Sequence, residues 1–152
     1  MRYCQRFCYT VRTGAHDRQT ETERKSLSSG QYDHPPRERG AAHQLRIIKG
    51  EIPSSKVYED EEVLAFKDIN PAAPIHVLVI PKKHITSLAT MEDGDEKIIS
   101  KIYKVINEIA EKQGFKEKGY RVIVNCGEDG GQEVGHLHFH LLAGKKLGEK
   151  IV

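Results

Sequence analysis

The chain has 152 residues and a formal net charge of +2, and 38% of its residues are hydrophobic. This length suits one domain with a substantial core, whereas the most apolar run, from Ile75 to Pro81, is too short to cross a membrane. The small basic excess falls before residue 44, so the composition argues against a strongly cationic nucleic-acid-binding domain. We therefore expect neither nucleic acid nor a membrane as a partner.

Three cysteines are present, at Cys4, Cys8 and Cys126, and no two of them form a Cys-x-x-Cys pair. They are too few and too scattered for a disulfide framework, and their spacing does not predict a structural zinc site. Free thiols are typical of a reducing compartment, so we expect a cytoplasmic protein.

The first part of the chain, residues 1–45, is polar, rich in Ser, Thr, Arg and Gly, and lacks apolar periodicity. Such a composition buries too little apolar surface to offset the entropy of ordering the chain. Asp17, Glu21 and Glu23 argue against an organelle transit peptide, because such peptides avoid acidic residues. We predict that residues 1–45 are a disordered or non-native N-terminal extension and that residues 46–152 form the folded domain.

The first predicted elements follow directly on this boundary. A short helix is predicted to begin at Arg46 and to end at Gly50. Residues 56–69 predict a hairpin of two strands, with the acidic residues 59–61 at its turn. A third strand is predicted over residues 75–81, where a proline ends it.

The second half of the chain predicts one helix and two further strands. Residues 94–115 predict an amphipathic helix, because apolar residues recur at helical spacing. Strands are predicted over residues 119–126 and 135–144, joined by a glycine-rich segment. The apolar residues of the helix are Ile98, Ile102, Val105, Ile106 and Ile109. The order of elements predicts an α+β domain with its helices on one face of an antiparallel sheet.

The segment "GHLHFHLLAG", residues 135–144, places a histidine at every second position and large apolar residues between them. Strand side chains alternate between faces with a period of two, so three imidazoles share one face and three apolar groups share the other. The imidazoles are those of His136, His138 and His140. One face is therefore predicted to pack into the core, and the other to carry chemistry or to contact solvent.

Two kinds of site use imidazoles in this way. A zinc site would need a ligand from elsewhere, because alternate strand residues diverge, and no His-Glu-x-x-His segment is present. In phosphate chemistry a neutral imidazole attacks phosphorus, and a glycine-rich turn presents backbone N–H groups to the anion. An imidazole is largely neutral at pH 7, and its neighbours lower its pKa further, so a nucleophile is available without a separate base. The residue types favour phosphate chemistry and leave zinc as an alternative.

Three separated segments carry a resemblance to a known family. They are the His-x-His-x-His segment with its two following apolar residues (136–142), "KDINPAAPIHVLVIPKKHI" (67–85) and "GYRVIVNCGEDGGQ" (119–132). The chain from about residue 46 to 144 resembles the histidine triad (HIT) nucleotide hydrolases, and among them the Hint branch of adenosine phosphoramidases. The resemblance implies a HIT-like fold, with a five-stranded antiparallel sheet, a short N-terminal helix and a long helix. It also implies a homodimer with a continuous ten-stranded sheet.

The resemblance also implies roles for individual residues. It assigns the nucleophile to His138 and assistance of the leaving group to His140, while His136 and His76 would orient the nucleophile. His84 occupies a familiar family position, but we see no chemistry that needs it and expect it to be structural. The implied nucleotide contacts are His138, His140, Phe66, Asp68, Ile69, Asn125, Gly131, Gln132 and Glu133.

The predicted function is metal-independent hydrolysis of the P–N bond of purine nucleoside 5′-phosphoramidates through a nucleotidyl-histidine, without a cofactor. A dinucleoside polyphosphate hydrolase or nucleotidyl transferase of the same superfamily is an alternative. A third possibility is a nucleotide-binding regulatory module with little turnover. Two departures from the family pattern are compatible with this third possibility. Glu133 stands where many relatives carry a hydroxyl residue, and Gln44 and Leu45 stand where the family usually has an aromatic residue that packs near the base.

Overall fold

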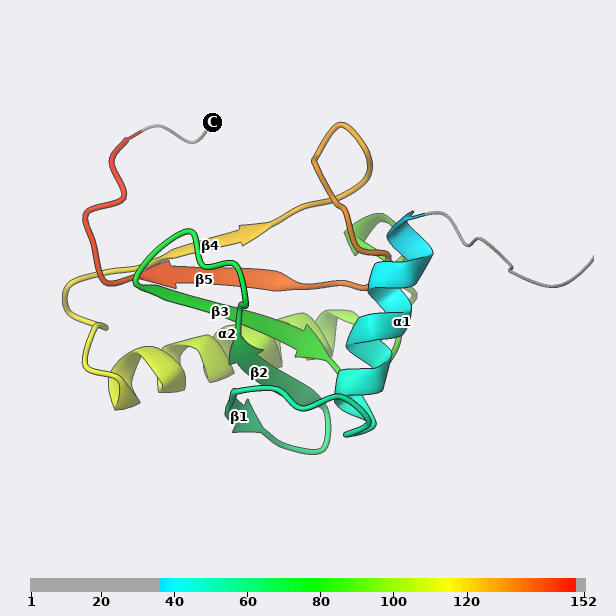
Figure 1. Ribbon diagram of the computed structural model, residues 1–152, viewed down its shortest axis with the longest axis horizontal. Helices are drawn as coiled ribbons and strands as arrows, with labels where there is room; N and C mark the ends of the chain where they lie inside the picture. The colour runs from blue at the N-terminus through cyan, green and yellow to red at the C-terminus, as the bar shows by residue number, and fades with distance from the viewer. Residues whose placement is uncertain (1–35, 150–152) are drawn as a thin grey trace, which may run out of the picture. The chain divides into compact units, whose positions relative to one another are not determined.

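The structure is a computed structural model that describes residues 36–149. Within these residues, two α-helices and one five-stranded antiparallel sheet form an α+β fold (Figure 1). The strands lie in the order β1-β2-β3-β5-β4. The predicted fold class and the predicted order of helix, three strands, helix and two strands are confirmed. Over the same residues, neither helix combines the length and the apolar character needed to cross a bilayer.

The element bounds differ from the predicted ones mainly at two places, the start of the first helix and the start of the last strand. In chain order the elements are α1 (Pro36–Ile48), β1 (Lys56–Glu59), β2 (Val63–Lys67), β3 (Ile75–Pro81), a 3₁₀ turn (Leu88–Thr90), α2 (Glu96–Lys112), β4 (Arg121–Val124) and β5 (Phe139–Ala143).

Helix α1 begins ten residues before its predicted start, so the domain boundary predicted after residue 45 falls inside a helix. Its buried positions are Ala41, Gln44 and Ile47, three residues apart. One of these side chains is small and one is polar, so the sequence shows little of the apolar periodicity that predicts a helix. Residues 1–35 of the predicted extension lie outside the described residues.

The predicted end of α1 at Gly50 is confirmed. Gly50 has a φ of 75°, which is strained for residues with a Cβ, and its N–H donates to the carbonyl of Ile47 at 3.0 Å. The N–H of Glu51 donates to the carbonyl of Arg46 at 2.9 Å. These two bonds form a Schellman motif, which satisfies the last helical carbonyls and turns the chain toward β1.

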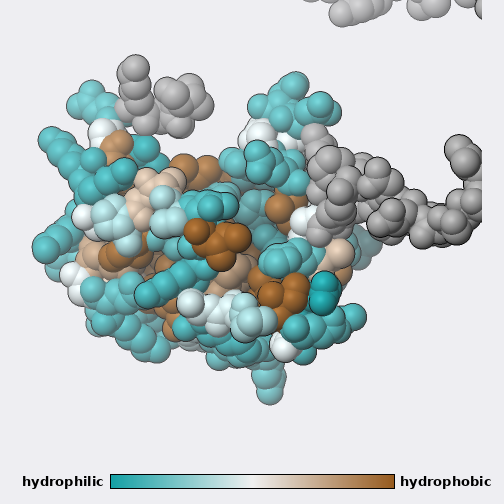
Figure 2. Space-filling view, in the orientation of Figure 1, coloured by the Kyte–Doolittle hydropathy of each residue, from teal (hydrophilic) through white to brown (hydrophobic). Residues whose placement is uncertain are grey.

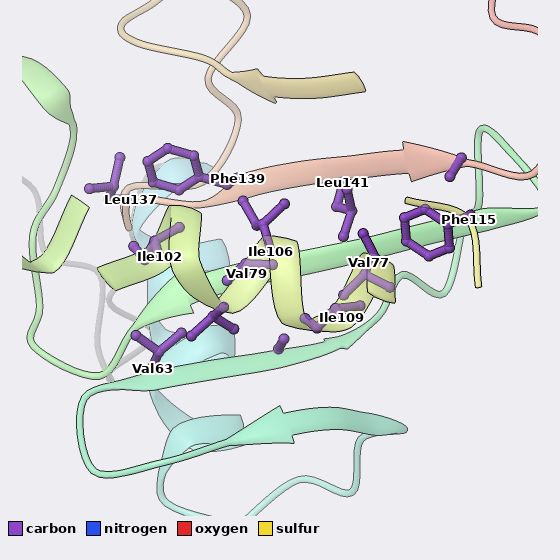
Figure 3. Close-up of a cluster of buried hydrophobic side chains, with 14 of the residues drawn as sticks. Val63, Val77, Val79, Ile102, Ile106, Ile109, Phe115, Leu137, Phe139 and Leu141 are labelled. Carbon is purple, nitrogen blue, oxygen red and sulfur yellow. The ribbon is translucent and has the colours of Figure 1, made fainter. Parts of the chain in front are cut away.

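Helix α2 covers one face of the sheet and supplies most of the core. Its predicted apolar stripe is confirmed, because the side chains at four of the five predicted positions are buried. They pack against alternate residues of β3 and β5, as Figure 3 shows. The cluster includes Ile102, Ile106, Ile109, Val77, Val79, Phe139 and Leu141.

The two helices lie on opposite faces of the sheet, so the prediction that both share one face was wrong (Figure 1). Ile47 of α1 packs with Leu64, Phe66 and Ile80, whose side chains face away from α2. Helical periodicity shows which stripe of a helix is buried but not against which face of a sheet. Because each central strand is covered on both sides, β2 is buried at four consecutive positions.

Strand β5 begins at Phe139, so of the three histidines in the row only His140 lies within the strand. The predicted alternation nevertheless continues upstream, because Leu137, Phe139 and Leu141 are all buried in the α2 cluster. His138 and His140 line a pocket on the other face. The residues just before β5 are therefore extended, and their side chains alternate between the core face and the pocket face as predicted.

We expect Ile106→Ala to lower the free energy of unfolding by about 2–5 kcal/mol, because the side chain is 1% exposed and its removal leaves a cavity in the α2 cluster. Ile69→Ala removes the same atoms from a side chain that is 88% exposed, and a change within about 0.5 kcal/mol is expected. Urea unfolding of both variants measures the difference. Equal losses would contradict the assignment of the core.

Candidate functional site

A pocket of about 840 Å³ lies between α1 and the sheet face opposite α2. One wall is formed by α1, through Gly40, Gln44 and Ile47, and the sheet contributes Phe66 and Leu78. Close packing brings α1 against the loop before β5, since a Cβ on Gly40 would lie 2.8 Å from a side-chain carbon of Val134. The pocket is thus closed by segments that are distant in the sequence.

Most of the predicted nucleotide contacts line this pocket, and three of the predicted site residues do not. His76, His136 and Gln132 are buried and do not belong to its lining. The predicted residues in the lining are Phe66, Asp68, Ile69, Asn125, Gly131, Glu133, His138 and His140.

His138 is held by the backbone of its own segment. Its Nδ1 lies 2.7 Å from the carbonyl oxygen of His136, and a carbonyl can only accept, so Nδ1 carries the hydrogen and donates it. The other ring nitrogen, Nε2, therefore keeps its lone pair when the ring is neutral. His136, which was predicted to orient the nucleophile, contacts His138 through its backbone carbonyl.

His140 belongs to a second hydrogen-bonded chain. The N–H of Ala72 donates to Nδ1 of His76 at 3.2 Å, so the hydrogen of the neutral His76 ring lies on Nε2. That Nε2–H donates to Nδ1 of His140 at 2.9 Å, which leaves the hydrogen of His140 on its own Nε2. His140 thus keeps a donor on Nε2, and its ring centroid lies 5.0 Å from that of His138.

His136 lies in a third arrangement, which contains His84, the histidine that was expected to be structural. Its Nε2–H donates to the carbonyl of Pro81 at 2.9 Å, and its Nδ1 accepts a hydrogen from Nδ1 of His84, also at 2.9 Å. The carbonyl of Pro81 therefore fixes the tautomer of His136, and the bond from His84 helps to hold its ring in place. The backbone carbonyl of His136 in turn holds His138. His84 and His136 are 52 residues apart, so no local pattern in the sequence could predict that they are in contact.

Burial keeps two of these rings neutral. The pKa of His136 is lowered to about 4, chiefly by desolvation and then by the nearby His84 and His138. The pKa of His140 is also lowered to about 4 by desolvation, with His138 and His76 adding to the effect and Asp68 opposing it. The predicted mutual lowering by imidazoles is present, but burial is the larger cause. At pH 7 both rings are therefore neutral, as their hydrogen bonds require.

The glycine-rich loop is held together by Gln132. Its Nε2 donates to the carbonyls of Thr86 at 2.6 Å and Val134 at 2.8 Å, and its Oε1 accepts from the N–H of Gly127 at 3.1 Å. The backbone N–H groups of Gly131 and Gln132 also donate to carbonyls within the loop, although the sequence suggested that such groups face an anion. The side chain of Gln132, which was predicted to contact phosphate, thus also shapes the loop and joins it to Thr86.

Among the side chains that the structure describes, those of residues 40–149, one group offers ligand atoms for a metal ion. Atoms of Asp68, His76 and His140 lie within 4.8 Å of one another. Two of these atoms, Nε2 of His76 and Nδ1 of His140, already share a hydrogen bond. A metal ion would have to displace that hydrogen and take both lone pairs, so the cluster fits a proton-ordered chain better than a metal site.

Comparison with known proteins agrees with the fold. A model of the HIT domain matches residues 49–147, and the chain therefore belongs to the HIT domain family. An uncharacterized HIT-like protein from Buchnera aphidicola subsp. Baizongia pistaciae is 47% identical to it over 104 residues, which are 68% of this chain and 93% of the relative.

Two solved structures are similar over the same region. A histidine triad protein from Clostridium difficile has 58% identity and a TM-score of 0.70, covering 71% of this chain and 94% of its own. A HIT family hydrolase from Legionella pneumophila Philadelphia 1 has 43% identity and a TM-score of 0.67, covering 69% of this chain and 94% of its own. These neighbours share the fold of two helices and a five-stranded antiparallel sheet.

The lowered pKa values predict how stability depends on pH. His136 and His140 have a folded-state pKa of about 4, below the unfolded value near 6.5, so the unfolded chain binds more protons between these pH values. The free energy of unfolding should therefore fall as the pH is lowered from about 6.5 toward 4. Urea unfolding at about pH 7.5 and about pH 5 tests this. His140→Asn should flatten the dependence, and a wild-type midpoint that is independent of pH would contradict it.

Proposed function

We propose that this protein hydrolyses the P–N bond of purine nucleoside 5′-phosphoramidates through a covalent nucleotidyl-histidine at His138. The observation that carries the proposal is the hydrogen bond from Nδ1 of His138 to the carbonyl of His136. It directs the hydrogen to one ring nitrogen and leaves a nucleophilic lone pair on the other, in a residue that lines the pocket. The resemblance of the catalytic segment to the Hint branch supports the same reaction.

In the proposed first step, Nε2 of His138 attacks the α-phosphorus and the P–N bond breaks. The Nε2–H of His140 donates a hydrogen bond to the phosphoryl group and stabilises its charge. In the second step, water releases the nucleoside monophosphate from His138. The proton that the leaving amine takes up in the first step comes from Nε2–H of His140. In the second step one hydrogen of the water returns to His140 and the hydroxyl group joins phosphorus, so one water molecule is consumed over both steps.

The remaining pocket residues suit a nucleoside. Asp68 lies at the end of β2, where its Oδ1 accepts from the N–H of Asn70 at 2.8 Å, and we propose that its carboxylate binds the ribose hydroxyls. Phe66 and Ile69 would contact the base, and Asn125 and Gly131 the phosphate side. The name of the Legionella relative, a HIT family hydrolase, supports hydrolysis as the class of reaction.

The alternative substrates differ in charge. Glu133 is exposed and lines the same pocket as His138 and His140, so its carboxylate opposes additional phosphate groups. A phosphoramidate carries one phosphoryl group, whereas a dinucleoside polyphosphate carries several. This carboxylate therefore favours the phosphoramidate over the polyphosphate, and it is also the residue that would reduce turnover if the protein acted as a nucleotide-binding module.

The first experiment compares hydrolysis of an adenosine 5′-phosphoramidate and a diadenosine polyphosphate in the presence of a chelator. We expect preferential cleavage of the phosphoramidate, and a loss of kcat/KM of at least about 10³-fold in His138→Ala, because the nucleophile is gone.

Retained binding of AMP by His138→Ala would show that this variant is folded. Preference for the polyphosphate would move the protein to the alternative branch, and nucleotide binding without turnover of either substrate would make it a binding module. Loss of activity on chelation would contradict a metal-independent reaction.

We also propose that two copies of the chain form a homodimer with a continuous ten-stranded sheet. Strand β4 forms one edge of the five-stranded sheet, and such an edge presents backbone groups that a second copy can pair with. On α2, Tyr103 is a large aromatic side chain that is 46% exposed, which fits a contact surface. Sedimentation equilibrium should give twice the mass of the chain, and a monomer at micromolar concentration would contradict this proposal.

A further inference from the structure

The pairing of β2, β3 and β5 sets the order of the side chains along the sheet side of the pocket. Phe66 of β2 lies beside Leu78 of β3, and Leu78 lies beside His140 of β5. Because neighbouring strands are about 4.8 Å apart, Phe66 and His140 are separated by about 10 Å across the sheet. A nucleotide whose phosphate lies at His140 would therefore place its base over Leu78 and Phe66, beside Ile47 of α1. On this face Figure 2 shows apolar surface bordered by hydrophilic surface.

Two polar side chains interrupt this apolar end of the pocket. Gln44 projects from α1 and is 5% exposed, and Ser54 lies in the segment between α1 and β1; both line the pocket. Across residues 40–149, whose side chains the structure describes, the buried side-chain atoms without a hydrogen-bond partner are Oε1 of Gln44 and Oγ of Ser54. Unpartnered buried polar atoms are unfavourable and rare in folded proteins. Both of these unpartnered oxygen atoms belong to residues that line the same pocket, which indicates that a bound ligand supplies their hydrogen-bond partner.

We propose that Gln44 is a specificity-determining residue that accepts a hydrogen bond from an N–H group on the edge of the nucleotide base. This inference rests on one part of the proposed function, namely that the pocket binds a purine nucleotide. The terminal torsion of a glutamine is broad, so the amide oxygen can turn toward a base in the pocket. Adenine, guanine and hypoxanthine each carry an N–H group on the base edge, whereas unsubstituted purine carries none.

The surroundings of Gln44 make this contact selective. Ile47, Phe66 and Leu78 contribute apolar area that every purine covers equally, so they do not distinguish one base edge from another. A base without a donor leaves Oε1 of Gln44 as it is in the free protein, buried and unpartnered. Polar groups that lose their partner discriminate between ligands more strongly than apolar contacts do.

The test compares equilibrium binding of AMP with that of purine riboside 5′-monophosphate, which lacks the N–H group, by calorimetry on the full chain. We expect the wild-type protein to bind AMP about three- to tenfold more tightly, the contribution of one neutral hydrogen bond. In Gln44→Met, which has a similar length and no strong acceptor, this ratio should fall to about one. The affinity for purine riboside 5′-monophosphate should change by less than about twofold, since its base makes no bond to Gln44.

The matched control is Gln113→Met, the same substitution at an exposed position that follows α2, which should keep the wild-type ratio. Thermal unfolding checks that both variants are folded. Equal wild-type affinities for the two nucleotides, an unchanged ratio in Gln44→Met, or no binding of AMP would each overturn the proposal. Because binding is measured without turnover, a protein that hydrolyses no phosphoramidate but shows the preference for AMP contradicts the proposed function alone.

Discussion

The site depends above all on the antiparallel pairing of β3 with β5. This register places His140 beside Leu78 and brings Nε2 of His76 within 2.9 Å of Nδ1 of His140, although the two histidines are 64 residues apart. The same pairing sends Val77 and Leu141 to the opposite face, where α2 covers them. A shift of one residue would exchange the two faces and bury the imidazoles against α2. Core packing and the geometry of the site therefore stabilise the same register.

Hydrogen bonds give each histidine a different role although all are the same residue type. Carbonyls fix the tautomers of His138 and His136, and a backbone N–H fixes that of His76. His140 then takes its tautomer from His76. Burial lowers the pKa of two of these rings, so the arrangement is stable only while they are neutral. One of two neighbouring rings thereby keeps a lone pair on Nε2 and the other keeps a hydrogen on Nε2, without a separate base.

Because the two helices lie on opposite faces of the sheet, α2 forms the larger core while α1 lines the pocket. Helix α2 packs on the face where β3 and β5 present only apolar side chains, and it forms the larger core. Helix α1 contacts the other face through Ile47 and leaves a pocket beside it. The wall that α1 contributes includes Gln44, whose amide oxygen is buried and unpartnered. A substitution on α1 can therefore alter the ligand that is bound while leaving the main core intact.

Local patterns in the sequence determined the secondary structure, the two-faced character of residues 137–141, the apolar stripe of α2 and the resemblance to the HIT family. Periodicity and turn residues express these features within about 20 neighbouring residues, which is why they were predictable. The start of α1 was not, because its contact positions include Gln44 rather than a full apolar stripe.

Only the tertiary structure decided which side chains meet across the sheet. It placed the helices on opposite faces, gave His84 its partner His136, and joined the amide of Gln132 to the carbonyl of Thr86. It also left Oε1 of Gln44 without a partner at the pocket. These contacts join segments that are far apart in the chain, and no local spacing encodes them. The sequence by itself determined the residues available for the chemistry, and strand pairing determined which of them act together, because only pairing sets distances between remote segments.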